Sequence, residues 1–271
     1  MRLAVSNIAW PREQDAAVAD LLAGRGVRGV EVAPTKVWPD PTTATEAEID
    51  AYRRWWEDRG FAVVAAQALL FGRPDLTLFD APDTRERTID YLGRVIRLCA
   101  QIGAGSLVFG SPKNRRIGSR DRAAVWPEAV ETFTRLGELA AAEGTCVVME
   151  ANPPEYGADF VTRAAEAAEL VRAVNHPGFR LHLDTACMTL AGDPPSVIAD
   201  GIDVLRHFHV SEPQLAAVGS GAVAHAEFAA QLRASGYGGW VSIEMREAQP
   251  FSLDTLAAAV DFAARTYFSA V

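Results

Sequence analysis

The sequence is poor in cysteine, in lysine and in long apolar runs, and each shortage excludes a class of protein. Its three cysteines, Cys99, Cys146 and Cys187, have no metal-binding spacing and are an odd number, so a disulfide scaffold is not expected. No apolar run is long enough to cross a bilayer, and the N-terminal MRLAVSNIAWP turns polar too early for a secretory signal. We therefore expect a cytoplasmic protein without a membrane partner.

Positive charge is also scarce. The formal net charge is −9, and arginine outnumbers lysine 24 to 2, the lysines being Lys36 and Lys113. A nucleic-acid binder needs a broad basic surface, so nucleic acid is not an expected partner. The apolar content of 49% and charged content of 23% are ordinary for a globular chain with a sizeable core.

What the sequence does contain is a repeating pattern of strand and helix. Segments typical of β-strands lie at 2–8, 29–33, 61–67, 105–110, 146–151, 179–184, 205–210 and 239–245. Helix-like stretches separate them, as at 84–103, where Ile89, Leu92, Ile96 and Cys99 share one face. Eight such units predict a single (β/α)₈ TIM barrel over residues 1–271. A doubly wound sheet is disfavoured, because no glycine-rich phosphate turn follows the first strand.

Four of the predicted strands end on a side chain that can bind a metal. Glu150, Asp184, His209 and Glu244 end the fifth to eighth strands, and the C-terminal strand ends of a TIM barrel meet at one rim. One such acid alone is usually a loop residue or a helix cap. Clustered carboxylates, however, repel one another unless a cation compensates them. Three carboxylates and an imidazole suit one divalent ion, Mn²⁺ first, with Mg²⁺ and Co²⁺ as alternatives.

These strand ends resemble those of the xylose isomerase-like barrels, the sugar phosphate isomerase/epimerase group that includes ketose 3-epimerases and inosose-handling enzymes. The resemblance covers the whole chain and is most specific at MEANP, HLDT, HFHVSE and VSIEM. It implies that Glu150, Asp184, His209 and Glu244 bind one divalent metal ion, and that Glu150 and Glu244 also act as acid and base on opposite faces of the substrate. The implied activity is a metal-dependent isomerase or epimerase of a sugar, sugar phosphate or sugar acid that works through an enediolate.

The chain also departs from the ketose 3-epimerase pattern. Those enzymes have a substrate-contacting histidine where this chain has Cys187, and an arginine where it has Leu215. A free ketohexose is therefore a poor guess for the substrate.

Other functions on the same scaffold follow from the same residues. A lyase or dehydratase acting on a cyclic polyol ketone or a dehydroshikimate-like acid would begin with the same proton abstraction, so the motifs leave this alternative open. An abasic-site endonuclease needs more metal ligands and a basic surface, which the charge of −9 disfavours. A degenerate barrel kept as a scaffold is disfavoured by the intact set of strand-end ligands.

The loop after the fourth strand, GSPKNRRIGSRDR, is basic in an acidic protein. It places Lys113, Arg115 and Arg116 on the predicted catalytic rim, with Lys36 in the matching loop after the second strand. Arginine binds phosphate or carboxylate through two parallel hydrogen bonds, and lysine adds a compact charge. We expect these residues, Lys113 and Arg115 above all, to hold an anionic substrate group. The alternative is a solvated loop, or one that pairs with acids of a neighbouring subunit in a homo-oligomer.

Further candidates have an equally simple structural explanation. Three further residues are substrate-binding candidates: Glu155, Cys187 and His225. The alternative for Glu155 is an exposed loop acid, for Cys187 a small buried thiol, and for His225 a residue that only begins a helix. His182 and His207 share the inward face with the predicted ligands and are expected to be interior histidines. Glu31, which ends the second strand, either hydrogen-bonds inside the barrel or contacts substrate.

Overall fold

Eight parallel strands form a closed barrel in the computed structural model, which describes residues 1–221 and 223–268. Each strand pairs with the next along the chain, and β8 pairs with β1. The strands are β1 Arg2–Ser6, β2 Gly29–Val32, β3 Ala62–Ala66, β4 Ser106–Phe109, β5 Val147–Glu150, β6 Phe179–Asp184, β7 Leu205–Ser211 and β8 Trp240–Glu244. The prediction of a (β/α)₈ barrel is confirmed.

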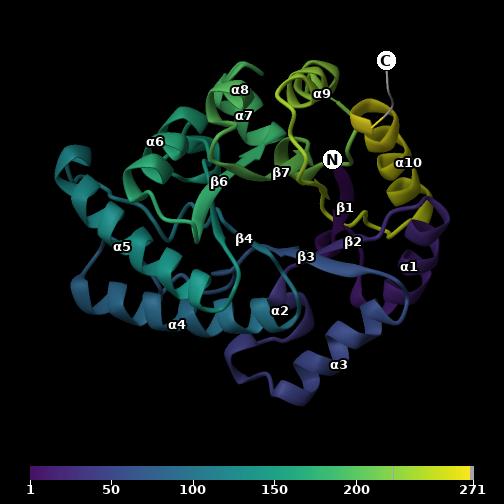
Figure 1. The fold of residues 1–271 in the computed structure, drawn as a ribbon, viewed down its shortest axis with the longest axis horizontal. Coiled ribbons are helices and arrows are strands. Elements are labelled where there is room, and N and C mark those ends of the chain that lie inside the picture. The colour runs from purple at the N-terminus through teal and green to yellow at the C-terminus, as the bar shows by residue number, and fades with distance from the viewer. Residues whose placement is uncertain (222, 269–271) are drawn as a thin grey trace.

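The helices lie outside the strands and follow the chain around the barrel, so that α10 returns to the side of α1 (Figure 1). The α-helices are α1 Asp15–Gly24, α2 Pro34–Val37, α3 Glu46–Glu57, α4 Pro82–Gln101, α5 Arg122–Ala142, α6 Ala164–Val174, α7 Thr185–Ala191, α8 Val197–Gly201, α9 His225–Ala234 and α10 Leu253–Ala263. Among the described residues, no helix combines the length and apolar character that crossing a membrane requires.

Local sequence signals explain where several helices begin and end. Thr45 and Glu48 form a reciprocal capping box at the start of α3, which satisfies two otherwise unpaired backbone donors. Pro82 occupies the first position of α4, where its missing N–H costs nothing. Asn175 ends α6 in the left-handed conformation with φ 48°, a role that asparagine tolerates better than most residues.

The main hydrophobic core fills the space between the strands and the surrounding helices. Helix α4 contributes the face that the sequence predicted, since Ile89, Leu92, Ile96 and Cys99 are all buried. The barrel interior is different. Alongside small apolar groups, such as Val108 with Cys146 and Val148, it holds completely buried polar residues from neighbouring strands: Ser6, Glu31, His182, His207, His209 and Ser242. TIM barrels are usually filled by Val, Ile and Leu, so this polar interior requires an explanation.

Candidate metal centre

The four predicted ligands meet at the C-terminal rim of the barrel. One side-chain atom from each of Glu150, Asp184, His209 and Glu244 lies within 4.8 Å of the corresponding atoms of the other three. The first three residues are buried, whereas the Glu244 side chain keeps 17% exposure. Strand register explains the convergence. Asp184 pairs with His209, and Glu244 pairs with Ser211, which follows His209 by two residues and so faces the same side of the sheet. The sequence therefore located this cluster without the structure.

Asp184 has two roles at once. Its Oδ1 accepts a hydrogen bond from the backbone N–H of Cys187 at 2.7 Å and so caps helix α7. Its Oδ2 accepts a hydrogen bond from the Ser211 hydroxyl. Burial and then the neighbouring Glu244 raise the pKa of Asp184 above its ordinary value. The capping explanation of a strand-end acid is therefore correct for one oxygen, yet the carboxylate still belongs to the cluster.

Glu150 experiences the crowding of the cluster most strongly. Burial, followed by the negative charges of Glu244 and Asp184, raises the pKa of Glu150 to about 8. Asn152 donates a hydrogen bond to Oε2 at 2.6 Å and fixes the carboxylate. The backbone just after β4 also makes room for it, because a Cβ at Gly110 would collide with Oε2. A cation bound here would remove the repulsion that favours the protonated form.

His209 presents one ring nitrogen to the cluster and is anchored by the other. Its Nε2 lies 2.9 and 3.0 Å from the two carboxylate oxygens of Glu31. This contact favours the tautomer with its proton on Nε2, which leaves the Nδ1 lone pair free. Nδ1 lies 3.4 Å from Glu244 Oε2 and makes no hydrogen bond with any residue that the structure describes. Burial lowers the pKa of His209, but Glu31 and Glu244 outweigh it and hold that pKa well above its usual range.

This arrangement fits a divalent ion. Metal-binding histidines commonly donate their second ring N–H to a carboxylate, which orients the ring and strengthens the ligand. Here Glu31 is that carboxylate, and Nδ1 of His209 is a buried nitrogen aimed at three acidic side chains. The three oxygen donors and one nitrogen donor match the ions expected from the sequence.

Glu31, His182 and His207 form a buried layer beneath the cluster. Glu31 has no exposed surface, and its Oε2 lies 3.2 Å from Nε2 of His207. Of the two roles expected for Glu31, hydrogen bonding inside the barrel is the one observed. The Nε2 of His182 lies 3.5 Å from Glu150 Oε1. The ring nitrogens of His182, His207 and His209 are also close enough together to share an ion. However, Glu31 already accepts contacts from two of these histidines, His207 and His209.

A cavity of about 290 Å³ lies over the cluster and provides space for a small substrate. Glu150, Asp184 and Glu244 form one wall. The remaining wall is made of Pro112, Asn152, Tyr156, Ala186, Cys187, Ser211, Gln214, Leu215 and Arg246. Cys187 and Leu215, which mark the departures from the ketose 3-epimerase pattern, therefore both line the cavity.

The expectation that Arg115 holds an anionic substrate is wrong. Its side chain is completely buried, and its guanidinium donates to the carbonyl oxygens of Gly110, Phe160 and Val161 and to Asn152 Oδ1 at 2.9 Å. All three guanidinium nitrogens thus have protein acceptors. Arg115 holds together the loops after β4 and β5, and through Asn152 it supports Glu150.

The other basic residues of these loops either form ion pairs with nearby acids or lie outside the cavity. Arg116 is exposed and pairs with Asp159 at 3.4 Å. Lys36 pairs with Glu247 at 3.0 Å and donates to the Trp10 carbonyl oxygen at 2.6 Å. Lys113 is exposed and is not among the residues that line the cavity, although its neighbour Pro112 is.

Two further substrate-binding candidates also lie away from the cavity. Glu155 is exposed in the turn after β5, where its neighbour Tyr156 lines the cavity instead. His225 is buried at the start of α9, where its ring nitrogens contact Glu212 at 3.1 Å and the Tyr267 hydroxyl at 2.8 Å. The structure thus gives His225 a structural role, because both ring nitrogens are engaged by the protein.

Sequence reasoning missed several residues around the cavity, among them Asn152, Tyr156, Gln214 and Arg246. A signal existed for Arg246, since it follows Glu244 by two residues and the side-chain period of a strand predicts that both face the same way. The same signal existed for Asn152, which follows Glu150 by two residues, whereas Tyr156 and Gln214 lie in short 3₁₀ turns, which the strand period does not describe.

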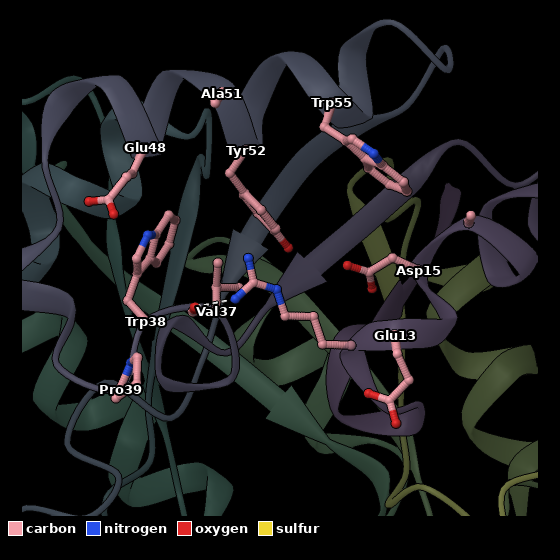
Figure 2. A pocket seen from close by; sticks show the side chains of 11 residues that line it. Glu13, Asp15, Val37, Trp38, Pro39, Glu48, Ala51, Tyr52 and Trp55 are labelled. Atoms are coloured by element: carbon pink, nitrogen blue, oxygen red, sulfur yellow. Dashed lines mark hydrogen bonds between the residues drawn. The ribbon is translucent and has the colours of Figure 1, made fainter.

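A second cavity, of about 670 Å³, lies elsewhere. It opens between the loops after β1 and β2 and helix α3, where the rings of Trp38 and Tyr52 meet edge to face at 5.3 Å (Figure 2). Arg12, which also lines this cavity, donates to the Val37 carbonyl oxygen at 2.6 Å. This cavity shares no lining residue with the one over the cluster.

Replacing Arg115 by methionine should destabilise the protein rather than weaken substrate binding. The change leaves buried carbonyl oxygens without donors, and the free energy of unfolding should fall by about 2–4 kcal/mol. Urea unfolding measures this loss. Arg116→Met is the matched control, because its exposed pair should contribute less than about 0.5 kcal/mol. Unchanged stability with a raised KM in Arg115→Met would restore the anion-binding interpretation.

Glu31→Gln should weaken metal binding, although Glu31 is not itself one of the four candidate metal ligands. The amide keeps the shape but loses the charge that orients His209, so the Kd for Mn²⁺ should rise about 10- to 100-fold. Calorimetric titration measures the change, with Glu155→Gln as an exposed control and His209→Ala as the variant expected to lose the ion. An unaltered Kd in Glu31→Gln would contradict this role.

Comparison with known proteins places the barrel in a family. L-ribulose 3-epimerase of Methylomonas sp. (strain DH-1) is 31% identical over 118 residues, which are 43% of this chain and 41% of that protein. The chain thus matches less than half the length of this curated relative.

Two solved structures share the fold. D-psicose 3-epimerase with D-tagatose from Clostridium cellulolyticum H10 superposes with a TM-score of 0.81 at 17% identity, over 98% of this chain and 99% of that one. 3-Keto-D-glucoside 4-epimerase from E. coli gives 0.78 at 20% identity, over 99% and 100%. The sequence model for the xylose isomerase-like TIM barrel matches residues 19–265, and the chain belongs to this family.

Proposed function

We propose that this protein is a divalent-metal-dependent isomerase or epimerase that transfers a proton at the carbon next to the carbonyl group of a sugar-like substrate. The observation that carries the proposal is the position of Glu150 and Glu244. Both belong to the cluster of candidate metal ligands, and both line the cavity above it. A substrate bound there lies within reach of two carboxylates.

Glu150, Asp184, His209 and Glu244 would hold the ion, most suitably Mn²⁺. When bound, a divalent ion supplies positive charge beside the substrate oxygens, where negative charge develops. The protein contributes the positions of its own groups. Asn152 orients Glu150, Ser211 and the start of α7 fix Asp184, and Glu31 fixes the ring of His209.

The two glutamates are the candidates for proton transfer. One carboxylate removes the proton from carbon, and the electron pair of the C–H bond moves toward the carbonyl group to give an enediolate. Return of a proton to the same carbon from the opposite face, by the second glutamate, gives an epimer. Transfer to the neighbouring carbon gives an aldose–ketose isomer.

The relatives support a sugar-like substrate. Their names specify L-ribulose, D-psicose and a 3-keto-D-glucoside, all of which carry a carbonyl group beside hydroxyl groups. The cavity of about 290 Å³ is of a size for one such unit. Cys187 and Leu215 give it contacts that differ from those of ketose 3-epimerases, which argues for a different substituent on the substrate.

Turnover in deuterated water should place solvent deuterium on the carbon next to the carbonyl. Proton NMR of a panel of ketoses, sugar acids and sugar phosphates, with Mn²⁺-loaded enzyme, measures both turnover and label. Glu150→Gln and Glu244→Gln should each lower kcat by about 10²–10⁴-fold. Glu155→Gln, an exposed glutamate of the neighbouring turn, is the control and should retain activity.

Both variants at the cluster must be assayed with their bound Mn²⁺ quantified, since each also removes a metal ligand. Product that forms without any deuterium would contradict proton transfer and would indicate a hydride shift instead.

A further inference from the structure

Arg246 is the one cation among the described residues that line the cavity over the metal cluster. It lies two residues beyond Glu244, the last residue of β8, and both side chains line the cavity. Although many arginines of this chain form ion pairs, no carboxylate of the described residues lies within 4.0 Å of the Arg246 guanidinium. Arg246 is exposed, and its guanidinium therefore forms no ion pair with the described residues.

The backbone and one N–H of Arg246 are fixed, and the rest of the guanidinium is free. The backbone N–H donates to the Leu215 carbonyl oxygen at 2.8 Å, and Nη2 lies 3.4 Å from the Gln214 carbonyl oxygen. Gln214 and Leu215 both have left-handed backbones, with φ of 60° and 57°, a conformation that costs ordinary residues energy. Tyr156 holds the same turn by accepting from the Gln214 N–H at 3.0 Å. Arg246 thus lies exposed beside this turn, with most of its donors unused.

The charge balance of the cavity determines what these donors can bind. Glu150, Asp184 and Glu244 give the wall three carboxylates, of which a divalent ion offsets two charges. The whole chain carries −9, so its general field repels anions. An anionic substituent in this negative field needs a local cation, and the planar fork of arginine binds an oxyanion through two parallel hydrogen bonds.

We propose that Arg246 forms an anion subsite, and that the substrate carries a carboxylate or phosphate group at the end remote from its metal-bound carbonyl. This inference rests on the proposed function for the position of the carbonyl end. The sequence predicted anion binding by the loop after β4, but there Arg115 is buried and Arg116 is paired. We therefore assign anion binding to Arg246, just after β8. This assignment also explains why Leu215 can occupy its position, since the adjacent Arg246 supplies the positive charge.

Binding to the Mn²⁺-loaded protein tests the subsite without requiring turnover. The probes are D-fructose, D-fructuronate and D-fructose 6-phosphate, which share a ketose but differ in charge. Wild type should bind at least one of the two anions on the order of 10- to 150-fold more tightly than D-fructose, the range for hydrogen bonds to a charged partner. The anion that gains most identifies the substituent as carboxylate or phosphate.

Arg246→Gln should abolish this preference while leaving the Kd for D-fructose and for Mn²⁺ unchanged, which also shows that the site remains folded. Arg116→Gln, an exposed and paired arginine of the same rim, should keep the preference. Wild type without any preference for an anion, or a preference that survives in Arg246→Gln, would overturn the proposal. Absence of turnover for every ketose would count against the proposed function but not against the subsite, because the two are measured separately.

Discussion

Three carboxylates confined to one poorly solvated rim are the constraint on which the rest of this structure depends. Charges of one sign that lose hydration together favour protonation, and Glu150 shows this through its raised pKa. A barrel that needed stability alone would place apolar residues at these strand ends. The arrangement is consistent with selection for a bound cation, because a cation coordinated by all three carboxylates offsets their mutual repulsion. Asp184 and Glu244 are the neighbours that cause most of the charge effect.

The polar interior of the barrel follows from the same constraint. His209 can serve as a ligand only if its ring is held, and Glu31 holds it from below. Glu31 is itself buried, so His207 provides a second partner for the carboxylate. The loop after β4 adds support from the side, because Arg115 holds Asn152 and Asn152 holds Glu150. The ligand cluster is thus supported by buried residues, of which Glu31, His207 and Arg115 do not line the cavity.

Much of the fold and the cluster could be predicted from sequence because strands are periodic. Alternation fixes which side chains face inward, and the closed barrel brings consecutive strand ends together, so Asp184 and His209 could be placed before any coordinates. Loops lack such a rule. Arg115 was expected to face a substrate, but its loop turns inward and the guanidinium binds backbone carbonyls. Arg246 was predictable from its spacing to Glu244, because residues two apart on an extended chain face the same way.

One divalent ion should bind to Glu150, Asp184, His209 and Glu244 together. It should displace the protons that this cluster holds without metal. Calorimetric titration of metal-free protein with Mn²⁺ at pH 7, in two buffers of different ionisation enthalpy, counts the protons released. Because the metal must displace a proton from Glu150, and because His209 also tends to be protonated in its absence, each ion should release between about one and two protons. In Glu150→Gln the number should fall by about one. Binding without proton release, or release that is unchanged in Glu150→Gln, would contradict the account.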